Sequence, residues 1–266
     1  MLKKICLLFL ISFSVPSIAA EPVLQDILAG KHRSANHKAR DRYRHPEQTL
    51  AFFDVQPNMS VVEIWPGGKA WYTEILAPYL KQDGLLYAAH FAAGSDVPYY
   101  NKSLKQFKLK LAASPAVYDK VVITALEPYS ELKIAPDNSV DRVLTFRNVH
   151  NWIQSGRAAA VFKSMYRALK PGGILGVVQH RNAPQTKQDP HAKSRYVTEA
   201  FVIQLAEQAG FKLLAKSEIN ANPKDTHDHP NGVGSLLPLL SGGKTNRAYY
   251  LNIGESDRMT LKFIKP

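Results

Sequence analysis

Cysteine is nearly absent from this sequence. The single cysteine, Cys6, lies inside an apolar segment near the amino terminus, too early in the chain for a lipoprotein cleavage site. If that segment is removed, the mature chain has no thiol, which excludes a disulfide framework and a cysteine nucleophile. The stability of the chain must then come from a hydrophobic core.

Long apolar runs and runs of like charge are also missing. The apolar segment near the amino terminus is shorter than the roughly 20 residues that a transmembrane helix needs. The chain has a formal net charge of +12, but its lysines and arginines are scattered, with no run of five or more. They also lack the interleaved aromatic residues of a nucleic-acid platform. We therefore expect a small-molecule substrate and no nucleic acid, with at most a loose association with an anionic membrane surface.

The first 20 residues have the features of a signal peptide. A basic pair precedes the apolar residues 5–15, and residues 17–19 have the small-x-small spacing that signal peptidase requires. These features predict that residues 1–20 are a signal peptide, cleaved after Ala19 or Ala20, and that the protein is periplasmic. Anchoring by an uncleaved amino-terminal helix is the alternative.

Apolar strand patterns alternate with helix patterns along most of the remaining chain, which predicts one α/β domain over residues 46–266 with a mostly parallel, doubly wound sheet. The amino-terminal residues 21–45 are polar and basic and predict a mobile arm that leads into a short helix. The expected strands are residues 60–65, 85–89, 121–124, 140–146, 174–179, 211–217, 247–253 and 259–264, and the expected helices are residues 46–53, 70–80, 99–112, 156–169 and 197–209. The last two strands predict a closing antiparallel pair after a loop excursion over residues 220–246.

The stretch from Ser60 to Leu76 has the pattern of a strand, a tight turn and a helix. An apolar run contains Glu63 near its end, breaks at Pro-Gly-Gly, and resumes as an amphipathic helix. In open α/β sheets a ligand binds at the carboxyl end of such a strand. Gly67 and Gly68 let the backbone approach that ligand closely. Glu63 either receives a cofactor's amino group or only orders its own turn.

This order of elements resembles the class I S-adenosylmethionine-dependent methyltransferases. The family's nucleotide turn reads acidic-x-Gly-x-Gly-x-Gly, and here Glu63 takes the acidic place and Gly67 the middle glycine place, while Trp65 and Lys69 stand in the outer glycine places. Two further segments, residues 141–144 and 169–173, match the family closely. The resemblance implies a Rossmann-like, seven-stranded sheet and S-adenosylmethionine as cofactor.

More narrowly, the chain is similar to a group of exported bacterial proteins described as predicted methyltransferases. The matching segments are residues 63–78, 145–152, 217–225 and 254–260. The second strand of this fold usually ends in a carboxylate that accepts hydrogen bonds from the ribose hydroxyls. Here the strand ends at His90, with no carboxylate before Asp96. We expect His90 to replace that carboxylate, either by accepting one hydrogen bond from the ribose or by stacking on the adenine.

A dense polar and aromatic cluster follows the fourth expected strand, where methyltransferases hold the atom to be methylated. Arg147 is a candidate for binding an acidic substrate, and His150 is a candidate general base. We expect Asn148 to bind the cofactor, and Asn151 and Trp152 to bind the substrate. The alternative is a hydrogen-bonded loop in which Trp152 only fills the core.

Two further segments carry candidate residues. His180, at the end of the fifth expected strand, is a second candidate base, and Arg181 a second anion anchor; the alternative for His180 is a structural hydrogen bond. The polar residues 220–229 include histidines and aspartates, but their spacing fits no established zinc pattern. We expect no metal there, and a lid or a wall of the substrate site instead.

The sequence therefore predicts an exported S-adenosylmethionine-dependent methyltransferase that acts on a small or envelope-associated substrate. A non-catalytic periplasmic binding or accessory protein with the same fold is the alternative. A hydrolase or isomerase that uses His150 is a weaker third interpretation. The chain has no Gly-x-Ser-x-Gly elbow and no Walker phosphate loop, which excludes the enzyme classes built on them.

Overall fold

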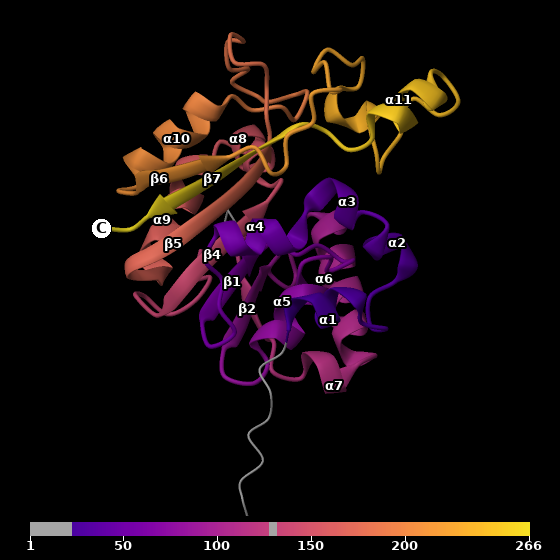
Figure 1. Cartoon of the computed structure of the whole chain (residues 1–266). Coiled ribbons are helices and arrows are strands. Elements are labelled where there is room, and N and C mark those ends of the chain that lie inside the picture. Colours follow the sequence, from indigo (N-terminus) through magenta and orange to yellow (C-terminus); the bar gives the residue numbers. More distant parts are fainter. Residues whose placement is uncertain (1–22, 128–131) are drawn as a thin grey trace, which may run out of the picture.

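The computed structural model describes residues 23–127 and 132–266 (Figure 1). The predicted signal peptide, residues 1–20, lies outside the described residues, so its cleavage stays a prediction. Within the described ranges, no helix combines the length and the apolar character needed to cross a membrane.

In the described residues, seven strands form one sheet in the order β3-β2-β1-β4-β5-β7-β6. Strand β7 runs antiparallel to both β5 and β6, and the other neighbours are parallel. This confirms the predicted Rossmann-like, mostly parallel sheet with a terminal antiparallel pair. The strands are β1 (Ser60–Ile64), β2 (Leu85–His90), β3 (Val122–Ala125), β4 (Val140–Phe146), β5 (Leu169–His180), β6 (Lys212–Ser217) and β7 (Arg258–Ile264).

Helices cover both faces of the sheet, with α9 and α10 on one face and α1, α4 and α5 on the other (Figure 1). The α-helices are α1 (Leu24–Ala29), α2 (Ala35–Lys38), α3 (Asp41–Arg44), α4 (Pro46–Phe52), α5 (Thr73–Leu80), α6 (Pro98–Ala112), α7 (Pro115–Tyr118), α8 (Val149–Gln154), α9 (Ala158–Ala168), α10 (Glu199–Gln208) and α11 (Arg247–Ile253), and η1 (Gly232–Ser235) is a 3-10 helix.

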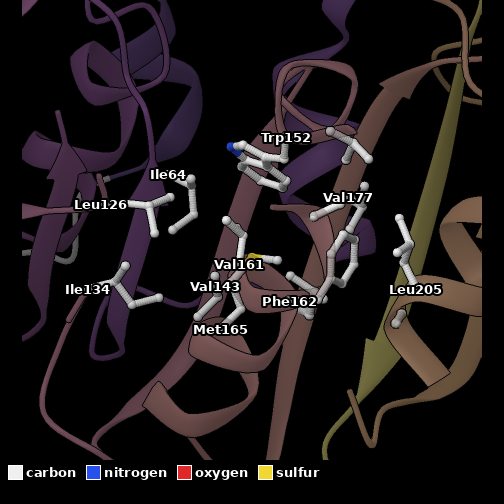
Figure 2. Packing of buried hydrophobic residues seen from close by; sticks show 14 of the residues in the cluster. Ile64, Leu126, Ile134, Val143, Trp152, Val161, Phe162, Met165, Val177 and Leu205 are labelled. Atoms are coloured by element: carbon white, nitrogen blue, oxygen red, sulfur yellow. The ribbon is translucent and has the colours of Figure 1, made fainter. Parts of the chain in front are cut away.

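The larger core cluster lies between the sheet and α8 to α10. Ile64 and Val143 from the strands meet Trp152 and Phe162 from the helices, and all four side chains are buried (Figure 2). A second cluster packs the opposite face of the sheet against α4 and α5. Because helices cover both faces, the central strands can be apolar at successive positions, which is why they stand out in the sequence.

The predicted strand over residues 247–253 is wrong, because this segment is helix α11. Tyr250 and Ile253, three positions apart, are buried on one side and pack with Leu236, whereas Tyr249 and Leu251 are exposed. Tyrosine, leucine and isoleucine in a short run suit a strand or a helix equally well, so the local pattern could not decide. The strand that pairs with β7 on its outer side is β6.

The predicted mobile arm is also wrong for residues 23–45, which form α1 to α3 and pack against the body of the protein. One attachment point is the buried carboxylate of Glu74 in α5, which accepts from His37 Nδ1 at 2.8 Å and from Lys110 Nζ. His32 Nε2 lies 2.8 Å from the Glu74 carbonyl oxygen, and Trp71 Nε1 donates to the His37 carbonyl. The basic residues of this segment therefore pair with a carboxylate outside the segment, that of Glu74.

Replacing Glu74 with alanine should lower the free energy of unfolding by about 3 kcal/mol, because it removes a buried carboxylate that accepts from His37 and Lys110 and lies 3.9 Å from the buried guanidinium of Arg33. Burial alone would raise the pKa of Glu74, but the hydrogen bonds from His37 and Lys110 outweigh it and hold the pKa below its usual value. Urea unfolding measures the loss, and trypsin should cut the variant faster near α2. Asp119→Ala is the control, since its ion pair with Lys81 is solvent-exposed and should change little.

Candidate functional site

The sheet has its topological switch point between β1 and β4, where ligands bind in open α/β folds. Two neighbouring cavities open there, of about 640 and 500 Å³. The first, called here the aromatic cavity, is lined by Trp65, Gly67, Phe91, Tyr99, Tyr100, Asn148, His150, Asn151, Gln154, Lys193, Arg195 and Leu239. The second, called here the basic cavity, is lined by His37, Arg40, Arg44, Pro66, Gly67, Gly68, Lys69, Trp71, Tyr99, Lys102, Ser103, Gln106, Arg147 and Pro238. Gly67 and Tyr99 belong to both.

The two glycines of the turn serve different purposes. Gly67 has φ +70°, and a Cβ built there would meet nothing within 4 Å, so its bare backbone faces open space at the junction of the cavities. A Cβ on Gly68 would lie 2.6 Å from Gln106 Oε1 in α6. Gly67 therefore leaves room for a ligand, and Gly68 leaves room for helix α6.

Trp65 occupies the first glycine place of the turn and keeps the backbone conformation of a glycine, with φ +47°. A bulky residue in that conformation carries strain on the order of 1–3 kcal/mol. Its side chain offsets this by donating from Nε1 to the Leu126 carbonyl at 2.8 Å and by packing 4.7 Å from the Phe91 ring. Phe91 in turn stacks on Tyr100 at 3.8 Å. The turn thus supplies one wall of the aromatic cavity.

Glu63 is buried and lines neither cavity. Its Oε2 accepts a hydrogen bond of 2.6 Å from Thr73 Oγ1, at the first residue of α5. Burial raises the pKa of Glu63 to about 8, so the carboxyl is neutral at pH 7. Of the two roles expected from the sequence, the geometry fits the one in which Glu63 ties its own turn to the next helix.

Glu63→Gln should become increasingly more stable than the wild-type protein as the pH rises. The unfolded carboxyl ionises near 4.5 and the folded one near 8, so between these values the folded state holds a proton that the unfolded state has released. The wild-type stability therefore falls with pH over this window, by up to about 1.4 kcal/mol per pH unit, and glutamine does not titrate. Urea unfolding at pH 5 and pH 8 should show the difference between the two proteins widen by about 3 kcal/mol. Parallel pH profiles would contradict the buried neutral carboxyl.

His90, at the end of β2, is fully buried and also lines neither cavity. Its Nδ1 accepts from the Phe91 backbone N–H at 2.8 Å, and its ring packs against Phe107. Burial lowers the pKa of His90 to about 4, so its imidazole ring is neutral at pH 7. His90 lies beside the backbone of Gly67 but does not itself line a cavity, so its contact with a cofactor stays a prediction. Among the described residues that line the two cavities, none is a carboxylate.

The polar cluster after β4 divides between the two cavities. Arg147, with φ +66°, lies in the basic cavity, whereas Asn148, His150 and Asn151 line the aromatic cavity. Asn148 Nδ2 donates to the Ile64 carbonyl at 2.9 Å, which ties the end of β4 to the end of β1. The segment after Asn148 is helix α8, which the sequence analysis did not predict.

Gln179 fixes the protonation state of His150. The side-chain oxygen of Gln179 accepts from the Val149 backbone N–H at 3.2 Å, so its Nε2 is the donor, to the Arg195 carbonyl at 3.1 Å and to His150 Nδ1 at 3.2 Å. His150 Nδ1 is then an acceptor, and the ring proton sits on Nε2. Burial lowers the pKa of His150 to about 3. This arrangement makes His150 a hydrogen-bond donor and argues against its expected role as a general base.

Nitrogen-15 NMR of the imidazole should show His150 as the neutral Nε2–H tautomer throughout pH 5–8. A Gln179→Glu variant should raise the pKa of His150, because a carboxylate beside Nδ1 favours the charged ring. A Gln179→Met variant, which removes the donor but adds no charge, is the matched control. Titration of His150 near pH 6.5 in the wild-type protein would contradict the buried neutral ring.

Three other candidate residues, Trp152, His180 and Arg181, lie away from both cavities. Trp152 is fully buried, with its ring 5.8 Å from that of Trp65. This position fits the alternative interpretation, in which Trp152 only fills the core. His180 is buried, and its Nδ1 lies 2.6 Å from Ser256 Oγ. Arg181 lines a separate pocket and pairs with Asp257 at 2.8 Å and with Glu218. The hydrogen bonds that Arg181 donates to Glu218 and Asp257 raise its pKa, and these pairs occupy its guanidinium.

The polar segment 220–229 is organised around one buried carboxylate. Asp225 accepts from Tyr196 Oη, from two backbone N–H groups and from the His229 ring at 2.9 Å. Among residues 23–127 and 132–266, no three histidine, cysteine, aspartate or glutamate side chains are grouped in a way that could hold a metal. Farther along the same excursion, Pro238 and Leu239 each line one of the two cavities.

The sequence analysis missed most of the aromatic wall and two of the three arginines that line the basic cavity, Arg40 and Arg44. Phe91, Tyr99 and Tyr100 follow directly after the second strand, and aromatic residues at that position were an available signal. Arg40 and Arg44 are four positions apart, which places them on one side of a helical turn. That spacing was visible, but their carboxylate partner, Glu255, is more than 200 residues away.

Comparison with known proteins agrees with this architecture. Residues 76–177, from α5 to β5, match a family model described as a methyltransferase domain. The chain has the fold of the class I methyltransferases. No curated protein matches the sequence.

Several solved structures share the fold at low sequence identity. A SAM-dependent methyltransferase from Aquifex aeolicus is 15% identical, with a TM-score of 0.57 over 86% of this chain and 93% of that one. The 4+2 cyclase SpnF is 15% identical, with a TM-score of 0.55 over 91% of each chain. A protein described as a possible exported protein from Bordetella parapertussis is 14% identical, with a TM-score of 0.53 over 91% of this chain and 78% of that one. At such identities the likeness establishes the fold alone.

Proposed function

We propose that the protein is an S-adenosylmethionine-dependent methyltransferase that uses the aromatic cavity as its cofactor site. The observation that carries the proposal is the position of this cavity, at the β1/β4 switch point with the bare backbone of Gly67 facing it. The methyltransferase-domain match over residues 76–177 supports the same conclusion.

The lining of the aromatic cavity fits the chemical groups of the cofactor in most respects. The aromatic rings of Phe91, Tyr99 and Tyr100 offer faces for a planar base, and the indole of Trp65 suits a sulfonium cation. Arg195 and Lys193 offer cations for a carboxylate. The ribose hydroxyls must find acceptors other than a carboxylate, which distinguishes this site from the usual member of the fold.

The residues of the chain position the reactants and contribute no general base in the aromatic cavity. S-adenosylmethionine supplies an electrophilic methyl group when bound. His150 holds its proton on Nε2, and the described lining residues include no carboxylate to remove a proton. This favours an acceptor atom that is already deprotonated when the substrate arrives, such as a carboxylate or phosphate oxygen.

Gly67→Val should abolish the binding of S-adenosylmethionine and S-adenosylhomocysteine, because its side chain projects into the open space of the cavities. Gly94→Val is the matched control. Gly94 has φ +76°, also has nothing within 4 Å of a built Cβ, and lies outside both cavities. This variant therefore introduces the same backbone strain as Gly67→Val without filling a cavity. Calorimetry should show wild-type and Gly94→Val binding alike and Gly67→Val at least tenfold weaker. No binding heat from the folded wild-type protein at millimolar ligand would overturn the proposal.

A second function, as a non-catalytic binding or accessory protein, is favoured by one specific feature. The outer glycine places of the turn hold Trp65 and Lys69, and no carboxylate among the described lining residues is offered to the ribose. SpnF, which is described as a cyclase, has a similar fold, so proteins of this fold are not confined to methyl transfer. Calorimetry with S-adenosylmethionine separates the two functions.

We also propose that the protein is exported to the periplasm. The basic, apolar and small-residue pattern of residues 1–20 supports this, as does the fold neighbour from Bordetella parapertussis that is described as a possible exported protein. The site then acts on a small or envelope-associated molecule.

A further inference from the structure

The basic cavity concentrates positive charge without a matching carboxylate in its described lining. The residues that carry or can carry this charge are His37, Arg40, Arg44, Lys69, Lys102 and Arg147. They come from the amino-terminal helices, the glycine turn, helix α6 and the end of β4. Residues from four separate parts of the chain therefore direct cations to one space of about 500 Å³.

Behind the cavity, one carboxylate is shared by several guanidinium groups. Glu255 accepts from Arg40 Nε at 2.5 Å, from Arg44 Nε at 3.3 Å and from Arg258 Nη2. Arg147 is also close enough to influence the pKa of Glu255. Burial alone would raise the pKa of Glu255, but these arginines lower it well below its usual value, so it is ionised. Four guanidinium groups around one carboxylate leave a local excess of positive charge.

Several N–H groups of these arginines have no partner in the described protein. Arg44 is only 3% exposed, yet its Nη1 makes no hydrogen bond, and the buried Nη2 of Arg40 makes none. The half-buried Arg147 side chain makes no hydrogen bond to a described residue either. Burial and repulsion from Arg258 outweigh the attraction to Glu255 and lower the pKa of Arg147 to about 10. Buried donors without acceptors cost free energy, and buried cations without counter-charge cost more. Arg40 and Arg44 both line the cavity, so an anion there would supply the missing negative charge.

We infer that the basic cavity binds the anionic group, a carboxylate or a phosphate, of an acidic small-molecule substrate. Gly67 and Tyr99 line both cavities, so a molecule held by its anionic group can extend toward the aromatic cavity. The anion site stands on its own observations, and its role as a substrate site rests on the proposed methyltransferase function.

The test is calorimetric titration with inorganic phosphate at constant ionic strength, set by chloride. Wild-type protein should bind phosphate, and Arg147→Met should bind it at least tenfold more weakly. Arg247→Met is the control, since Arg247 is an exposed arginine outside the cavity and its loss changes the net charge equally. Equal weakening in Arg147→Met and Arg247→Met, or no phosphate binding by the wild-type protein, would overturn the inference.

A thermal-unfolding measurement separates a binding role for Arg147 from a structural one. Without phosphate, Arg147→Met should unfold at the same temperature as the wild-type protein or a higher one, because the lost charge is desolvated and repelled by Arg258. A structural arginine would show the opposite, a clear fall in unfolding temperature, and that result would count against the inference. Arg40→Gln, at the more exposed edge of the cluster, gives a second variant that should also lose phosphate binding.

Titration in the presence of S-adenosylhomocysteine tests whether the carboxylate bound in the basic cavity belongs to the substrate or to the cofactor. Phosphate should bind with unchanged affinity when S-adenosylhomocysteine is present at saturating concentration. Mutually exclusive binding would assign the cavity to the cofactor's own carboxylate and overturn a separate substrate site. If S-adenosylhomocysteine itself fails to bind, the proposed methyltransferase function falls, while phosphate binding lost in Arg147→Met would still establish the anion site.

Discussion

The carboxylate of Glu255 is the contact on which the arrangement of the site depends. It joins Arg40 and Arg44, next to and within α3, to Arg258 at the start of β7. Arg40 and Glu255 are 215 positions apart in the sequence. This contact fastens the amino-terminal helices above the carboxyl ends of β1 and β4. A buried ion pair of this kind is weak evidence for stability, because desolvation of the charges offsets much of their attraction. Its clear consequence is geometric, since it holds guanidinium groups at the edge of a cavity.

Most elements of the fold were predictable from the sequence, because their signals are local. The central strands are short apolar runs bounded by turns, and the helices between them have apolar residues at helical spacing. The two errors concern segments whose structure depends on distant partners. Residues 247–253 became a helix that packs on Leu236, and residues 23–45 became ordered through Glu74. No local pattern in either segment contains that information.

The site was predictable in position and much less so in detail. The residues after β4 do lie at the cavities, because the carboxyl end of a central strand must face the switch point. Helix α8 then turns His150 toward the aromatic cavity and Trp152 into the core. The protonation of His150 depends on Gln179, and the pairing of Arg181 depends on Asp257 and Glu218. Those partners lie too far along the chain to be assigned from sequence.

The charges of the two cavities bear on each other. A sulfonium in the aromatic cavity would be a cation brought close to the uncompensated arginines of the basic cavity, which share Gly67 and Tyr99 with it. In a site of low dielectric constant, that repulsion is not removed by solvent. An anion in the basic cavity would cancel it, so each ligand would strengthen the binding of the other by the same factor. The described lining residues of the two cavities include no carboxylate, so the negative charge opposite the cofactor's sulfonium would be supplied by the substrate.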